Sequence, residues 1–305
     1  MTTTTTIVAP TAATTTRRKP RAACASTSDA SAAPTSELRG SVAREQLKWG
    51  LSVIGHAVAA SSALPILANV LLASDGMEHV KLAATNLEIG ISVRIGAAIE
   101  TPGGITLPAR LLADVTGGLP GEAIGLAVED RTQTVQLRCA RFETNIKGIE
   151  AAEFPTIPTV PAHKQPDAVF PPALLRELID QVAFAAASEI TRPVLAGVLL
   201  RLQGTAATFA AADGYRLSVR TVALPEPTAA PIEVIIPRGA MIEIGRVMKA
   251  VDDEADVELH IIANGGQVVF RTEQIEIATR TIEGKFPAFE RVIPASYTTR
   301  AMLDR

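Results

Sequence analysis

The sequence predicts an α+β protein built from two copies of one unit, in which two helices pack on mostly antiparallel sheets. Three observations predict this fold: motifs that recur at a nearly constant offset, helical periodicity at the start of each copy, and alternating strand segments between Gly, Asp and Asn turns. The 305 residues are 47% hydrophobic and 20% charged, which is enough for a sizeable core. We expect no membrane span, because no apolar run reaches about 18 residues.

The duplication is visible in four landmarks that occur twice in the same order. Pro65–Leu72 recurs as Pro193–Leu200, 128 residues later, with six of eight positions identical. The other three landmarks recur at offsets of about 127, 129 and 132, and they are Leu82–Val93 with Phe209–Val219, Ile105–Arg110 with Val234–Arg238, and Glu153–Pro155 with Lys285–Pro287. This spacing predicts two copies of a unit of about 125 to 130 residues.

Each unit is predicted to open with a helix. Apolar residues at helical spacing mark it in the first copy (Leu47, Leu51, Ile54, Val58) and in the second (Leu174, Leu175, Leu178, Ile179, Val182). Pro171 and Pro172 precede the second of these helices, where proline is tolerated. The apolar runs at Pro65 and Pro193 are predicted as strands, followed by alternating segments such as Val80–Ala84 and Val257–Ile262.

A second helix is predicted in each unit after a strand that ends in proline. It covers Pro108 to about Val115 in the first copy and Pro237 to about Ala250 in the second. Strands at Val135–Cys139 and Val268–Arg280 close the two units. Two helices on an antiparallel sheet would cover one of its faces and leave the other exposed.

The predicted boundaries are a tail at residues 1–38, units at 39–163 and 164–295, and the start of a third copy at 296–305. The tail is almost entirely Thr, Ala, Ser, Pro and Arg, so we expect it to be disordered. Its first 28 residues contain Arg17, Arg18, Lys19 and Arg21 but no acid, which suits either an organellar transit peptide or a variable extension. Thr299–Asp304 resembles the beginning of another unit.

Cysteine content and charge limit the class of protein. Cys24 and Cys139 lie far apart, which favours neither a disulfide framework nor a thiolate metal site and fits a reducing compartment. The formal net charge is −3, whereas domains that bind nucleic acid are usually basic. A ring that is acidic outside and basic inside would have the same total, so the distribution of charge matters more.

Several motifs within this duplicated frame resemble one family. In the first unit they are Ala63–Leu72, Ala84–Gly90, Pro108–Arg110 and Glu153–Pro155; in the second they are Asp213–Leu217, Ile236–Arg238 and Gly284–Pro287. Together they resemble the first two domains of the bacterial DNA polymerase III beta subunit, the DNA sliding clamp. The resemblance covers about residues 40 to 298.

The resemblance implies a cytoplasmic, non-catalytic processivity factor that encircles duplex DNA. It implies a head-to-tail homodimeric ring of six similar domains, three per subunit, with helices lining the hole and sheets forming the rim. Double-stranded DNA of any sequence would be one partner, and the replicative polymerase catalytic subunit and the clamp loader would bind through short peptide motifs. No cofactor, metal or membrane is implied. Because this chain carries two units, we expect it not to form the two-subunit ring, although three such chains could supply six domains.

A clamp must hold DNA by electrostatics without reading bases, so cations are expected on its inner helices. Arg238, Arg246 and Lys249 are predicted to share one helix face, and Arg44 and Lys48 are spaced by one helical turn. Arg110 and Arg176 hold comparable helix positions. A simple solvated helix face would carry the same residues, so that alternative stays open.

The family also grips partner peptides in a hydrophobic pocket on its second domain. Carried over by motif, the pocket wall consists of eight residues: Leu195, Ala212, Gly214, Tyr215, Arg216, Leu217, Pro237 and Met241. A shallow apolar slot can anchor a few aliphatic or aromatic side chains. Without the resemblance, Leu195 and Leu217 would be interpreted as ordinary core residues.

The alternative function is a duplicated α+β enzyme with an unrecognised active site. The sequence gives it little support, since the four histidines (His56, His79, His163 and His260) lack metal-ligand spacing and no Gly-rich phosphate loop follows a strand. The acidic cluster Asp252, Asp253, Glu254 and Asp256 is interpreted as a solvated loop and not as a cation site. Asp213 precedes a glycine and is predicted to shape a turn.

Overall fold

The computed structural model describes residues 37–59, 63–161, 163–188, 192–293 and 296. Within them, the first repeat runs β1 (Arg39–Ala43), α1 (Arg44–Ile54), β2 (Asn69–Asp75), β3 (His79–Thr85), β4 (Ile89–Thr101), β5 (Gly104–Pro108), α2 (Ala109–Gly118), β6 (Ala123–Glu129), β7 (Thr134–Cys139) and β8 (Phe142–Lys147). The short strand β9 (Ile149–Glu150) follows. The predicted third copy and the tail up to residue 36 lie outside the described residues.

The second repeat has the same order of elements. It runs β10 (Ala168–Phe170), α3 (Pro172–Val182), β11 (Gly197–Gln203), β12 (Ala206–Ala212), β13 (Leu217–Ala223), β14 (Ile232–Pro237), α4 (Arg238–Val247), β15 (Val257–Ile262), β16 (Gln267–Arg271) and β17 (Ile275–Arg280). Short 3₁₀ helices connect these elements: η1 (Gly55–Ala57), η2 (Pro65–Ala68), η3 (Asp130–Thr132), η4 (Ala151–Glu153), η5 (Ala183–Ala185), η6 (Pro193–Leu195), η7 (Met248–Ala250), η8 (Ala263–Gly265) and η9 (Phe289–Arg291). The predicted duplication is therefore confirmed element by element.

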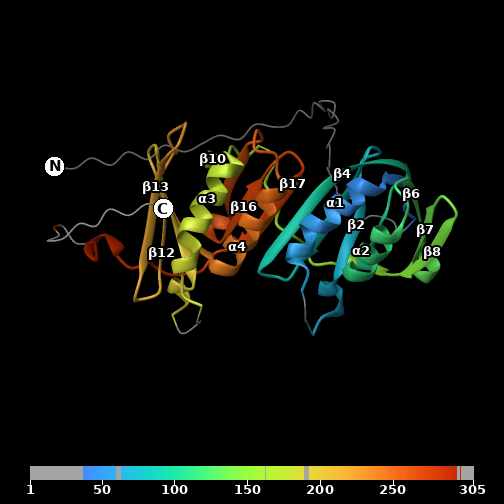
Figure 1. Cartoon of the computed structure of the whole chain (residues 1–305), viewed down its shortest axis with the longest axis horizontal. Coiled ribbons are helices and arrows are strands. Elements are labelled where there is room, and N and C mark those ends of the chain that lie inside the picture. Colours follow the sequence, from blue (N-terminus) through green and yellow to red (C-terminus); the bar gives the residue numbers. More distant parts are fainter. Residues whose placement is uncertain (1–36, 60–62, 162, 189–191, 294–295, 297–305) are drawn as a thin grey trace, which may run out of the picture. The chain divides into compact units, whose positions relative to one another are not determined.

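Each repeat forms two four-stranded antiparallel arrangements. In the second repeat these are β13-β12-β11-β14 and β10-β15-β16-β17, and the first repeat has the equivalent orders β4-β3-β2-β5 and β1-β6-β7-β8. In the first repeat β4, which is 13 residues long, also pairs with β1 and so connects the two arrangements. The helix pairs α1/α2 and α3/α4 lie over the sheets of their own repeats (Figure 1), as the α+β prediction required.

The two repeats join through β17 of the second and β4 of the first. These strands pair antiparallel from Ile275 opposite Val93 to Thr279 opposite Ile89, so the sheet continues across the junction. A side-chain contact supports the same junction on the helices, where His56 Nδ1 lies 2.9 Å from Glu243 Oε2 of α4. In the first repeat β8 is the equivalent of β17, and in the second repeat β13 is the equivalent of β4. Among the described strands, β8 and β13 each have one edge that pairs with no other strand.

The core explains why these segments form helices and strands. The buried faces of α1 and α3 carry Leu47, Leu51, Leu178 and Ile179, the residues from which the helices were predicted. Phe170 and Phe209 pack edge to face at 5.9 Å between ring centroids and are almost fully buried. Leu38 lies in the predicted tail but is fully buried in the same core, so the ordered repeat begins before the predicted boundary.

Local details differ from the prediction at two places. The runs at Pro65 and Pro193 begin as 3₁₀ helices and become strands only at Asn69 and Gly197, because proline at the first helical positions starts a turn and cannot donate to a strand ladder. Val268–Arg280 is a hairpin of β16 and β17 and not one strand. No helix among the described residues is long and apolar enough to cross a membrane.

Candidate DNA-facing and peptide-binding surfaces

The predicted cations of the second repeat line one groove between α3 and α4. Arg238, Arg246 and Lys249 border this groove, which has a volume of about 240 Å³. Arg246 Nη1 donates to Glu243 Oε1 at 2.6 Å, and Arg238 Nε donates to the Ala183 carbonyl at 3.3 Å. Lys249 is exposed, belongs to η7 and makes no hydrogen bond or ion pair within the described part of the chain. It is thus the freest of the three for an anionic partner.

Arg44 and Arg176 donate hydrogen bonds to backbone carbonyls, a role that the sequence did not predict. Arg44 donates from Nε to the Thr116 carbonyl at 3.1 Å and from Nη2 to the Gly117 carbonyl at 3.0 Å. Arg176 donates from Nη1 to the Met248 carbonyl at 3.0 Å. In each repeat an arginine of the first helix therefore satisfies carbonyls where the second helix ends, a site that favours cations.

These contacts leave little of either guanidinium for DNA, because the side chains of Arg44 and Arg176 are 16% and 24% exposed. Arg44 also pairs with Glu45, and Arg176 with Asp253. Lys48 on α1 and Arg110 on α2 are exposed and make no such contacts. The predicted DNA-facing set accordingly separates into two helix-capping arginines and five more available cations.

The predicted peptide-pocket residues gather around a small separate core. Leu195, Ala212 and Leu217 pack in one hydrophobic cluster with Phe286 and Phe289. Pro237 ends β14 and pairs with Gly197 beside this cluster. Met241 is fully buried in the main core, so its side chain is not accessible from the surface in this structure.

A tight turn presents the remaining pocket residues. Asp213 Oδ1 accepts hydrogen bonds from the backbone N–H groups of Tyr215 and Arg216 at 3.0 Å, and Gly214 has a φ of +95° that favours glycine. The backbone hydrogen bond from Tyr215 is the largest of several effects that lower the pKa of Asp213. The Tyr215 side chain is fully exposed. The carboxylate holds the turn, and the aromatic ring is left exposed.

Three aromatic residues at these surfaces were not predicted as site residues. Phe286 and Phe289 complete the small core, with ring centroids 6.3 Å apart. Phe184 is half exposed, borders the α3/α4 groove and lies 5.5 Å from the Arg216 guanidinium carbon. Phe286 stands in a recognised landmark, whereas nothing in the local sequence distinguishes Phe184 or Phe289 from ordinary apolar residues.

The described residues contain no group of three or more His, Cys, Asp or Glu side chains placed to hold a metal ion. Within the acidic cluster, Asp253 pairs with Arg176 and Asp252 Oδ1 accepts from the Glu254 N–H at 3.1 Å. These contacts agree with the predicted solvated loop.

Family models match both repeats. Residues 39–158 match the DNA polymerase III beta subunit, N-terminal domain, and residues 170–288 match its central domain. These two ranges correspond closely to the two structural repeats described above.

Individual relatives agree with the family models. The chain is 31% identical to the beta sliding clamp of Synechocystis over 281 residues, covering 86% of this chain and 70% of that protein. It is 32% identical to the beta sliding clamp of Pseudomonas aeruginosa, of which it covers 70%. The Bacillus subtilis sliding clamp structure superimposes with a TM-score of 0.80 at 25% identity, covering 86% of this chain and 69% of that one. The chain belongs to the DNA polymerase III beta subunit family, whose members are the beta sliding clamps.

Proposed function

We propose that this chain is a non-catalytic processivity factor, a clamp subunit that holds duplex DNA and tethers a replicative polymerase. The observation that carries the proposal is the junction between its repeats. Two equivalent units join edge to edge through β17 and β4, and the equivalent strands β8 and β13 keep one unpaired edge each. Units that join in this head-to-tail manner are suited to a ring whose rim is a continuous sheet.

The proposed DNA-holding surface is the helical layer. Lys48, Arg110, Arg246 and Lys249 are exposed on or beside the helices, and Arg238 borders the α3/α4 groove. Lysine and arginine on solvated helices contact phosphates without selecting bases. Such contacts allow a protein to stay on DNA while it moves along the duplex.

The proposed tethering surface is the small hydrophobic cluster beside the Asp213–Arg216 turn. Leu217 is partly buried against that cluster, and Tyr215, two residues before it in the chain, has an exposed ring. An apolar slot beside a free aromatic ring can anchor a short peptide from a polymerase or clamp loader.

Griselimycin provides a direct probe, because a Pseudomonas aeruginosa sliding clamp structure is described as bound to it. We expect the chain to bind griselimycin at one site in isothermal titration calorimetry, and Leu217→Arg to weaken that binding at least tenfold because a charge enters the apolar slot. Tyr215→Ala removes only a fully exposed ring, so a loss of affinity in this variant would come from a lost contact and not from a disturbed core.

Phe142→Ala is the matched control, since Phe142 is an exposed aromatic residue on β8 of the first repeat. Retained affinity in Leu217→Arg, with the fold verified by circular dichroism, would refute the pocket assignment. Equal losses in Phe142→Ala and Tyr215→Ala would show that the effect is not local to the slot. The alternative of a duplicated enzyme has no observation in its favour.

A further inference from the structure

A polar cavity lies on the sheet surface at the junction of the two repeats, away from the helices and from the peptide slot. Its volume is about 600 Å³, and its walls come from β2, β3, β4, the β16–β17 hairpin, and β15 with the segment before it. One row of cross-strand neighbours runs through it, with Ser92 opposite Glu276, Glu276 opposite Arg271 and Arg271 opposite Glu258. Directly paired residues project from the same sheet face, so these side chains form one continuous polar strip.

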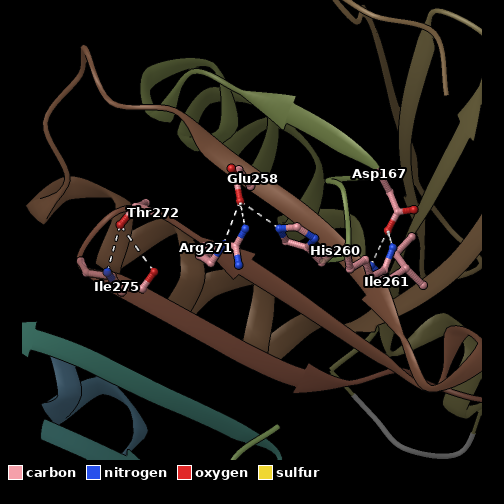
Figure 2. Close-up of polar contacts among 8 residues, drawn as sticks. Asp167, Glu258, His260, Ile261, Arg271, Thr272 and Ile275 are labelled. Carbon is pink, nitrogen blue, oxygen red and sulfur yellow. Dashed lines mark hydrogen bonds and ion pairs between the residues drawn. The ribbon is translucent and has the colours of Figure 1, made fainter. Parts of the chain in front are cut away.

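Some of the charged side chains of this strip are paired with one another. Glu258 Oε2 accepts a hydrogen bond from Arg271 Nε at 2.8 Å and one from His260 Nε2 at 3.0 Å, as Figure 2 shows. At the other end, Arg94 Nε donates to Asp75 Oδ2 at 2.6 Å. These pairs account for two of the three cations that line the cavity.

The remaining charges are mostly negative. Five carboxylates and three cations line the cavity, which leaves an excess of two negative charges. Glu273, Glu276 and Asp256 make no hydrogen bond or ion pair within the described residues, and Lys81 is the remaining cation. An anion would meet repulsion here, whereas a cation would meet unused acceptors.

Ser92 supplies an independent sign of a missing partner. The residue is 5% exposed and lines the cavity, and its Oγ is buried without a hydrogen-bond partner. Ala83 faces it from β3 and Glu276 from β17. An unsatisfied buried hydroxyl is destabilising and uncommon in native proteins. A ligand that exchanges a hydrogen bond with Ser92 would remove this cost.

We propose that this cavity binds an alkyl-ammonium group, which donates hydrogen bonds to Glu276 and Ser92 and is surrounded by Asp256 and Glu273. An ammonium has three donors and no acceptor, which matches a site rich in unpaired carboxylates. A bare metal ion fits less well, because the described residues contain no group of three ligands placed for one. The ammonium can come from a lysine side chain of a partner protein or from a free diamine, and both present the same chemistry.

The test is a titration of the full chain, followed by NMR or calorimetry, with two probes: N-acetyl-lysine methylamide and 1,5-diaminopentane. We expect saturable binding of at least one amine and none of 1,5-pentanediol, which has the same length without charge. Saturation by the lysine amide indicates a protein partner, and saturation by the diamine alone indicates a free amine. Failure of both amines to saturate overturns the proposal.

Substitutions of the proposed binding residues test where the amine binds. Glu276→Gln and Ser92→Ala should each weaken amine binding, the former about tenfold since it removes a charge-assisted hydrogen bond. Glu100→Gln is the matched control, because Glu100 is an exposed carboxylate at the far end of β4, outside the cavity.

Lys81→Met should tighten binding at least threefold by removing the unpaired cation, a gain that a misfolded variant would not produce. Unchanged affinity in both Glu276→Gln and Ser92→Ala would overturn the proposal. The presence or absence of amine binding does not bear on the clamp function, because the test of that function uses the peptide slot.

Discussion

Glu258 holds together a partly buried polar network in the second repeat, and Glu258→Gln should destabilise the protein in a pH-dependent manner. Its carboxylate accepts hydrogen bonds from Arg271 at 2.8 Å and from His260 at 3.0 Å (Figure 2). Burial alone raises the pKa of Glu258, but the hydrogen bonds from His260 and Arg271 outweigh burial and leave the pKa below its ordinary value of 4.5. The folded state therefore binds the proton less well than the unfolded chain.

The sign of the pH effect follows from this lowered pKa. A carboxylate whose pKa is lower in the folded state stabilises the fold above its unfolded pKa and loses this contribution as the pH falls through its folded pKa. Hydrogen bonds to charged groups contribute about 1.5–3 kcal/mol each when buried, and the 34% exposure of the Glu258 side chain reduces this. We expect Glu258→Gln to lower the free energy of unfolding by about 1–2 kcal/mol at neutral pH.

Urea denaturation at pH 7.5 and at pH 3 measures this effect. The difference between wild type and Glu258→Gln should be full at pH 7.5 and smaller at pH 3, which lies below the ordinary carboxyl pKa of 4.5. Glu276→Gln is the matched control, since Glu276 lies on β17 opposite Arg271, makes no hydrogen bond or ion pair within the described residues, and should change stability by less than about 0.5 kcal/mol. A loss of equal size at both pH values would refute the electrostatic explanation.

Two further predictions concern the stability of the repeats. Arg44→Ala should cost about 1–2 kcal/mol in urea denaturation, because the Thr116 and Gly117 carbonyls lose their donors; an unchanged midpoint would contradict the capping role. Gly90→Val should lower the free energy of unfolding by about 1–3 kcal/mol in the same measurement, because a Cβ there would lie 2.8 Å from Ile157 Cγ2. Wild-type stability would show that the segment containing Ile157 moves aside without cost.

The sequence predicted the duplication and most elements because their signals are local and periodic. The segment Val257–Ile262 was predicted with the bounds that β15 has in the structure, and Pro171 and Pro172 do precede and begin α3. The extension of the core to Leu38 could not be predicted, since a single apolar residue next to a low-complexity tail carries no periodicity. Its burial depends on β1, which pairs with strands far along the chain.

The candidate surfaces were predicted less completely, because they depend on contacts between distant residues. Charge and helical position identify Arg44 and Arg176 as candidates for DNA contact, but only the fold reveals that they bond carbonyls 72 or more residues away. Likewise Met241 stands in a pocket motif and yet is buried in the main core. The polar strip through Ser92 and Glu276 arises from pairing between the two repeats, which no spacing within either repeat encodes.

The proposed clamp function rests on DNA contact that is electrostatic and indifferent to sequence. The most direct measurement is a fluorescence anisotropy titration of two unrelated 30-base-pair duplexes at several salt concentrations. We expect weak and equal affinities whose logarithm falls linearly with the logarithm of salt concentration, and replacement of Arg246 and Lys249 by Ala should flatten the slope by about 0.9 for each lost phosphate contact. Lys147→Ala, which changes an exposed lysine on β8, should leave the slope unchanged. A tenfold preference for one duplex, or a slope that the double variant does not alter, would contradict the account.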